Sequence, residues 1–128
     1  MADIVLDASA ILAFLQREKG ADIVEGLLPD AAVSANNLAE VVAKLVDHGV
    51  PIDDIEQIIA AFDFSIIDVS KDDAVANGLL RAATRKAGLS LGDRSCLALA
   101  QRLTLPALTT DRSWGQLAGL TVEVRLLR

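Results

Sequence analysis

The sequence predicts a three-layer α/β/α sandwich built around a mainly parallel sheet. Short apolar segments alternate with longer helical segments along the chain, and this alternation is typical of an α/β domain. The chain has 128 residues, of which 52% are hydrophobic. That length suits one domain, and that composition provides a core without disulfide bonds. We therefore expect a single domain that spans residues 1–128.

Five apolar segments are expected to form the strands, and they are residues 3–6, 32–34, 64–68, 105–110 and 121–127. Six helices are expected between them, over residues 8–16, 20–28, 37–48, 51–62 and 71–86, and from residue 90 onward. Three of these helices begin with a polar residue followed three positions later by an acid, which is the spacing of a capping box. The pairs are Asn37–Glu40, Ser70–Asp73 and Ser90–Asp93.

The composition excludes several classes of protein. The net charge is −6, whereas a general nucleic-acid-binding protein is normally basic, so a polyanionic substrate would need something that offsets the repulsion. The single cysteine, Cys96, excludes an intrachain disulfide and fits a reducing compartment. There is no glycine-rich phosphate loop and no apolar run of membrane length. We expect that the first residues are not a signal peptide, because Asp3 and Asp7 lie among the apolar residues and a basic segment is lacking. We expect a cytoplasmic protein that does not associate with a membrane.

Acidic residues follow two of the predicted strands. Asp7 comes directly after the first strand, and Asp111 comes after the segment LPALTT. Ligands of open α/β sheets bind outside the carboxyl ends of the strands, so these two carboxylates could converge there. Asp93 and Glu40, each early in a predicted helix, are the further candidates for the same site.

Asp93 is the most unusual of the four acids. Steps of three, four and seven residues along its helix lead to Cys96, Leu97 and Ala100, which form an apolar stripe. A carboxylate on that stripe is expected to face the interior, where an isolated charge is costly. A functional role would explain its presence.

Each acid also has a purely structural explanation. Asp7 could cap the helix that follows it, and Asp111 could cap a turn through Trp114. Asp93 could pair with Ser90 in a capping box. Glu40 is expected opposite the apolar face of its helix, where it could pair with Asn37 or Lys44. These explanations are independent of one another. They neither account for a convergence of the four acids nor exclude it.

If the four carboxylates converge, they require a cation, because closely spaced carboxylates repel one another. Oxygen ligands without cysteine or histidine suit Mg²⁺ or Mn²⁺ rather than Zn²⁺, and the lone His48 is expected at a helix end on the surface. Such a cation can bind a phosphate and activate a water. It would also offset the negative charge of the protein locally.

Three further residues lie next to the candidate acids. Arg94 and Arg112 each directly follow an acid and could hold flanking phosphates, although an ordinary surface role would also explain them. Ser9 could orient a ligand or water, or could simply cap the first helix.

Four stretches resemble the PIN-domain family, in the same order and along nearly the whole chain. They are IVLDASAIL, the NNLAE stretch that contains Glu40, LSLGDRSCLALA and LTTDRSW. The chain length and the patterns DxSA, LxxxDxxxLALA and TxD are most similar to those of the VapC-type toxins of bacterial and archaeal toxin–antitoxin pairs. Each of the four stretches alone is a weak signal, but all four in this order are fairly specific.

The resemblance implies a PIN-like fold and a Mg²⁺- or Mn²⁺-dependent endoribonuclease whose site falls on Asp7, Glu40, Asp93 and Asp111. It also implies a homodimer held inactive by a cognate antitoxin whose C-terminal segment wraps the toxin. One departure concerns RNA recognition. With three Phe, one Trp and no Tyr, the chain has no obvious platform on which bases could stack.

Two other functions are compatible with parts of the pattern. A phosphatase of the haloacid-dehalogenase type also has an aspartate after its first strand, but it needs a second acid two positions later, where this chain has Ser9. A degenerate PIN-like domain that only binds would not need all four acids. A metal-binding titration would distinguish such a domain from a metal-dependent nuclease.

Overall fold

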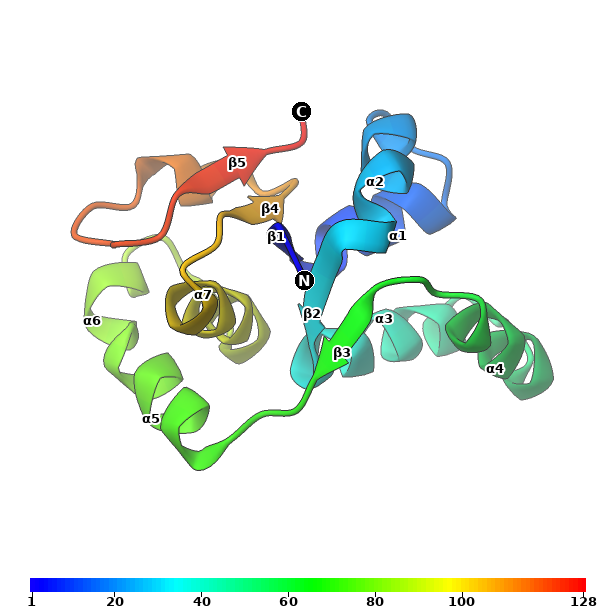
Figure 1. Ribbon diagram of the computed structural model, residues 1–128, viewed down its shortest axis with the longest axis horizontal. Helices are drawn as coiled ribbons and strands as arrows, with labels where there is room; N and C mark the ends of the chain where they lie inside the picture. The colour runs from blue at the N-terminus through cyan, green and yellow to red at the C-terminus, as the bar shows by residue number, and fades with distance from the viewer.

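The computed structural model describes all residues, 1–128, and contains one sheet of five parallel strands (Figure 1). The strands lie in the order β3-β2-β1-β4-β5. Their bounds are Ile4–Leu6 (β1), Ala31–Ser34 (β2), Ser65–Ile67 (β3), Ala107–Thr109 (β4) and Val124–Leu126 (β5). Every neighbouring pair is parallel, so the predicted fold class is confirmed.

Seven α-helices connect and cover the strands. They are Ala8–Leu15 (α1), Ala21–Leu27 (α2), Ala35–Asp47 (α3), Ile52–Ala60 (α4), Lys71–Leu79 (α5), Arg81–Thr84 (α6) and Leu91–Leu103 (α7). Two short 3₁₀ helices complete the chain, Leu28–Asp30 and Arg112–Gln116. No helix is both long enough and apolar enough to cross a lipid bilayer.

The three inner strands, β2, β1 and β4, bury both of their faces, in two separate cores. Ile4 and Leu6 point to one side, where they pack with α1, α2 and α3. Val5, between them, points to the other side and packs with Cys96 of α7 and with Trp114. Because side chains alternate along a strand, this pattern places one helical layer on each face of the sheet. In Figure 1, α5 and α6 lie outside α7 on the second face.

Two helices differ from the prediction. Helix α3 begins at Ala35 rather than Asn37, because the Ser34 side chain accepts the Asn36 N–H and caps the helix directly at the end of β2. The predicted helix over residues 71–86 is divided into α5 and α6. Gly78 lies in the last turn of α5, where a glycine weakens a helix by about 0.5–1 kcal/mol.

Candidate active site

Asp7 is the most buried of the four candidate acids, with 3% of its surface exposed. It follows β1 and takes the N-cap position of α1, but its side chain does not cap that helix. Instead, Oδ2 accepts a hydrogen bond from Ser9 Oγ at 2.7 Å and another from Thr109 Oγ1 at 3.0 Å. The capping explanation is therefore wrong for Asp7, and two hydroxyl groups fix its carboxylate at the carboxyl edge of the sheet.

The surroundings of Asp7 raise its pKa from 3.8 to about 6. Burial is the largest cause, because it disfavours the charged form. The negative charges of Asp93 and Glu40 raise the pKa further, while the hydrogen bonds from Ser9 and Thr109 lower it. The three acids therefore interact electrostatically, although they lie on three different elements.

Glu40 is half-buried on α3 and faces the first turn of α7. The Asn37 amide donates both to Glu40 Oε1, at 2.8 Å, and to the carbonyl of Gly92, at 2.9 Å. Burial raises the pKa of Glu40, as does the charge of Asp93, while the Asn37 hydrogen bond and the charge of Lys44 lower it. Asn37 thus pairs with Glu40 through its side chain rather than in the expected capping box, and Lys44 acts on Glu40 only through its charge. Glu40 also lies close enough to Asp7 and Asp93 to interact with their charges.

Asp93 lies at the third position of α7 and forms the predicted capping box with Ser90. Its Oδ2 accepts the Ser90 N–H at 2.9 Å, and its own N–H donates to Ser90 Oγ at 3.1 Å. Cys96, Leu97 and Ala100 of the apolar stripe are fully buried, whereas Asp93 is only half-buried. The expectation that Asp93 faces the interior is therefore wrong, because the first turn of α7 lies at the margin of the core.

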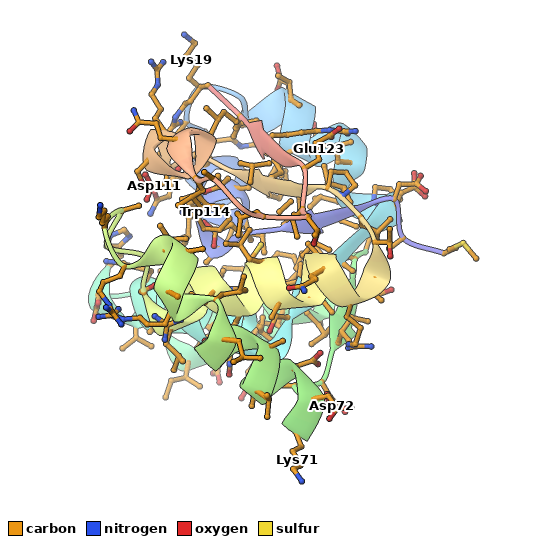
Figure 2. All side chains as sticks on the ribbon, turned by 90° about the vertical axis from the view of Figure 1, so that its left-hand side faces the viewer. Lys19, Lys71, Asp72, Asp111, Trp114 and Glu123 are labelled. Atoms are coloured by element: carbon orange, nitrogen blue, oxygen red, sulfur yellow. The ribbon has the colours of Figure 1, made fainter.

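Asp111 is exposed and caps the 3₁₀ helix that contains Trp114, as one of its structural explanations predicted (Figure 2). Its Oδ1 accepts from Ser113 N at 2.9 Å and from Ser113 Oγ at 2.7 Å. Its backbone N–H donates to Thr109 Oγ1 at 3.1 Å. Thr109 therefore joins the backbone of Asp111 to the carboxylate of Asp7.

The four acids occupy one edge of the sheet but do not close around a point. No three acidic, histidine or cysteine side chains are arranged so that they could hold a metal ion. Asp93 and Asp111 direct carboxylate oxygens to N–H groups of their own caps. Each of the two keeps one carboxylate oxygen without a hydrogen bond, Oδ1 in Asp93 and Oδ2 in Asp111. Metal binding by all four acids would require the side chains to move closer together.

The three flanking residues have mixed roles. Ser9 does not cap α1 but donates to Asp7, and its Oγ accepts the Thr110 N–H at 3.0 Å. Arg94 is half-buried and donates to Asn77 Oδ1 and to the Leu89 carbonyl. Arg112 is exposed and makes no side-chain hydrogen bond or ion pair. Ser9 occupies the position at which a phosphatase of the haloacid-dehalogenase type has its second acid, and here it holds the Asp7 carboxylate in place.

Three residues at this site were not identified from the sequence. Thr109 could have been recognised, because it is the first residue of the TxD pattern. Asn37 was expected to cap α3, but it is fully buried beside Glu40. Gly92 showed no local signal, because its role depends on Glu40, which lies far away in the sequence.

The fold and site define a three-layer α/β protein with an acidic cluster at the carboxyl edge of a parallel sheet. A family model described as PIN domain matches residues 4–120. The match covers most of the chain, so the protein belongs to the PIN domain family. No curated protein sequence matches the chain significantly.

Solved structures of toxin–antitoxin proteins have a similar fold. A toxin–antitoxin complex from Klebsiella pneumoniae is 22% identical, covers 98% of both chains and has a TM-score of 0.76. The DNA-bound VapBC of Salmonella typhimurium is 16% identical over 100% of both chains, with a TM-score of 0.78. VapC20 of Mycobacterium tuberculosis, described as a sarcin–ricin loop cleaving toxin, is 20% identical over 96% of this chain and 99% of its own, with a TM-score of 0.75.

Proposed function

We propose that the protein is a divalent-metal-dependent endoribonuclease and the toxin of a toxin–antitoxin pair. The observation that carries this proposal is the buried Asp7 carboxylate, whose pKa is raised to about 6 beside the charges of Asp93 and Glu40. Three mutually repelling carboxylates at the ligand-binding edge of an α/β sheet are costly unless a cation neutralises them. Membership of the PIN domain family and the likeness to VapC20 support RNA cleavage as the reaction.

The chemistry of the residues present suits such an ion. The donor set consists of carboxylate and amide oxygens, which suits Mg²⁺ or Mn²⁺. Both hydrogen bonds to Asp7 go to Oδ2, which leaves Oδ1 without a protein donor. Asn37 Oδ1 is buried without a hydrogen-bond partner beside Glu40. We propose Asp7, Glu40, Asp93 and Asp111 as the residues that hold the ion.

The residues of this chain would prepare the site before substrate binds. When bound, the divalent ion would lower the pKa of a water and stabilise charge that develops on the phosphate. Ser9 and Thr109 hold one oxygen of Asp7, and the Asn37 amide holds one oxygen of Glu40. Arg94 and Arg112 would contact phosphates on either side of the cleaved bond.

The proposal is tested with purified protein, RNA and a chelator. Cleavage should require Mg²⁺ or Mn²⁺, stop in EDTA and return when metal is added in excess. Asp7→Asn, purified in parallel, should be inactive and thereby exclude a contaminating nuclease. Cleavage that continues unchanged in EDTA, with Asp7→Asn inactive, would show that the protein cleaves RNA without a metal.

The alternative is a PIN-like domain that binds without cleaving. The complete set of four acids speaks against it, because a domain that only binds has no need of a costly buried carboxylate such as Asp7 beside further acids. Calorimetric titration with Mn²⁺ separates the two functions. A chain that neither binds Mn²⁺ nor cleaves RNA would support the alternative.

A further inference from the structure

A cavity of about 200 Å³ lies beside the acidic site. Residues at the ends of β2 and β3 and on helices α5 and α7 line it. Figure 1 shows where these four elements lie in the fold. The apolar walls of the cavity include Ile67, Val69, Leu91 and Leu99. The cavity is smaller than the roughly 300–1,000 Å³ of a site for a drug-sized ligand, so it suits one small group.

The polar groups on one side of this cavity are already hydrogen-bonded. The Asn77 amide donates to Ser95 Oγ at 2.9 Å and to the Leu91 carbonyl at 3.0 Å, while its oxygen accepts from Arg94. Ser95 Oγ also accepts from the Asn36 amide and donates to Leu91. Asn77 and Ser95 are 4% and 6% exposed, so this network is a built part of the fold.

Other polar groups of the cavity have unused hydrogen-bonding capacity. Asn36 uses its amide N–H on Ser95, but its Oδ1 receives no hydrogen bond. The Asp68 carboxylate makes no hydrogen bond or ion pair and is exposed at the mouth. Asp73 differs, because Arg102 neutralises it at 2.7 Å. The Asp68 carboxylate is a charged acceptor, whereas Asn36 offers one acceptor, Oδ1, and one further N–H. The cavity therefore favours a ligand that donates hydrogen bonds to Asp68 and disfavours an anion beside it.

We propose that this cavity binds a nucleobase that has an exocyclic amino group, namely adenine, cytosine or guanine, next to the cleaved bond of the RNA. The inference rests on the proposed function. The cavity and the acidic site share two elements: Asn36 lines the cavity and Asn37 holds Glu40, while Leu91 lines the cavity and Gly92 contacts Glu40. A base can pack between apolar side chains where aromatic residues are absent.

Binding is tested first in EDTA, so that it does not depend on cleavage. Methyl NMR spectra of the full chain are recorded during titration with adenosine, cytidine or uridine. Adenosine and cytidine should shift the methyl signals of Leu91 and Leu99, and uridine, which lacks the amino group, should bind several-fold more weakly. Asp68→Asn should weaken cytidine binding several-fold, because it removes the charged acceptor.

The second test fills the cavity. Ala74 lines it from α5 and is exposed, so Ala74→Leu should occupy the space without unfolding the chain. We expect this variant to keep Mn²⁺ binding, lose nucleoside binding and lose base preference at the cut site. Ala82→Leu, at an exposed alanine of α6 that does not line the cavity, is the matched control and should behave as wild type.

Several outcomes would overturn the proposal. Equal binding of uridine and cytidine, or shifts that map to other methyl groups, would exclude selection by the amino group. Shifts produced only by an arginine-rich peptide would assign the cavity to a protein partner instead. If wild type binds cytidine here but cleaves no RNA, the proposed nuclease function fails while the base site remains.

Discussion

Gly92 lacks a side chain at the point where the carboxylate of Glu40 lies against the first turn of α7. A Cβ atom on Gly92 would come closer than 3.0 Å to Glu40 Cδ and to both carboxylate oxygens. Gly92 has ordinary helical backbone geometry, so its conformation does not require glycine. The contact with Glu40 is therefore the physical reason for a glycine at this position.

The first prediction is that Gly92→Ala stabilises the protein and impairs its site. Alanine in a helix is favoured over glycine by about 0.5–1 kcal/mol, so the melting temperature should rise. The Glu40 carboxylate is the end of a flexible side chain, so it should move aside. Mn²⁺ affinity and RNA cleavage should each fall roughly 10–100-fold, as when a supporting residue of a metal site is lost.

Two variants control this experiment. Gly78→Ala lies in α5, where an added Cβ meets nothing within 4 Å, so it should raise stability and leave cleavage unchanged. Combining Gly92→Ala with Glu40→Asp should recover part of the Mn²⁺ affinity, because the shorter side chain makes room for the methyl group. A Gly92→Ala protein that binds Mn²⁺ and cleaves RNA as wild type would show that the position of Glu40 is unimportant.

The second prediction separates the capping role of Asp93 from its proposed metal role. The side-chain oxygen of asparagine also accepts hydrogen bonds, so Asp93→Asn should keep the hydrogen bond from the Ser90 N–H. The substitution destabilises the helix, because it removes a negative charge that interacts favourably with the helix dipole. It also stabilises the fold, because it removes the repulsion between Asp93 and Asp7. These two effects oppose each other, so the free energy of unfolding should change by less than about 1 kcal/mol. Cleavage at saturating Mg²⁺ should fall by more than about 100-fold. Near wild-type cleavage would leave Asp93 with a structural role only.

The third prediction concerns the dependence of stability on pH. The pKa of Asp7 is raised from 3.8 to about 6, so between these values the folded state binds a proton that the unfolded state has released. The contribution of Asp7 to the free energy of unfolding is therefore greatest below about pH 4. This contribution, roughly 3 kcal/mol, is lost as the pH rises through about 6. Asp7→Asn should remove this loss. Denaturant unfolding of both proteins in EDTA measures the difference, and parallel curves would contradict it.

The sequence predicted what local patterns determine. The Ser70–Asp73 and Ser90–Asp93 capping boxes both form, because each needs only residues three positions apart. The alternating pattern of the strands and helices was also sufficient for the three layers. The expected box at Asn37 did not form, since Ser34 competes for the same role and the Asn37 amide binds Gly92, 55 residues away.

The arrangement of the site could not be predicted in the same way. Asp7 is fixed by Thr109, which lies 102 residues further along the chain. The periodicity of α7 correctly gave its buried stripe, but periodicity does not determine where along a helix the core ends. Asp93 therefore lies on the correct stripe and yet is half-buried.

The fourth prediction ranks Asp111 below Asp7 in importance. The charges that raise the pKa of Asp7 are those of Asp93 and Glu40, and Asp111 is not among them. Asp111→Asn can still accept from Ser113 and still donate its N–H to Thr109. It should reduce cleavage roughly tenfold, less than Asp7→Asn does. If Asp111→Asn is as inactive as Asp7→Asn under saturating Mg²⁺, then Asp111 contributes to the site as strongly as the buried acid.

The last prediction concerns the antitoxin, which the likeness to toxin–antitoxin complexes leads us to expect as a partner. Val46 of α3 and Ile52 of α4 are 55% and 71% exposed, and α4 lies at the periphery of the fold (Figure 1). We expect an antitoxin helix to cover these side chains. Changing both to serine should leave folding and cleavage intact, since surface substitutions usually alter stability by less than about 0.5 kcal/mol.

The measurement is co-purification with the cognate antitoxin, sought as the product of a gene next to that of this protein. Wild type should form a complex that survives gel filtration, and the double variant Val46→Ser, Ile52→Ser should elute alone. The matched control changes Val75 and Leu79 to serine, because these α5 residues are 54% and 75% exposed on the opposite side of the molecule (Figure 1). If the α5 variant loses the complex and the α3–α4 variant retains it, the antitoxin binds the other side of the protein.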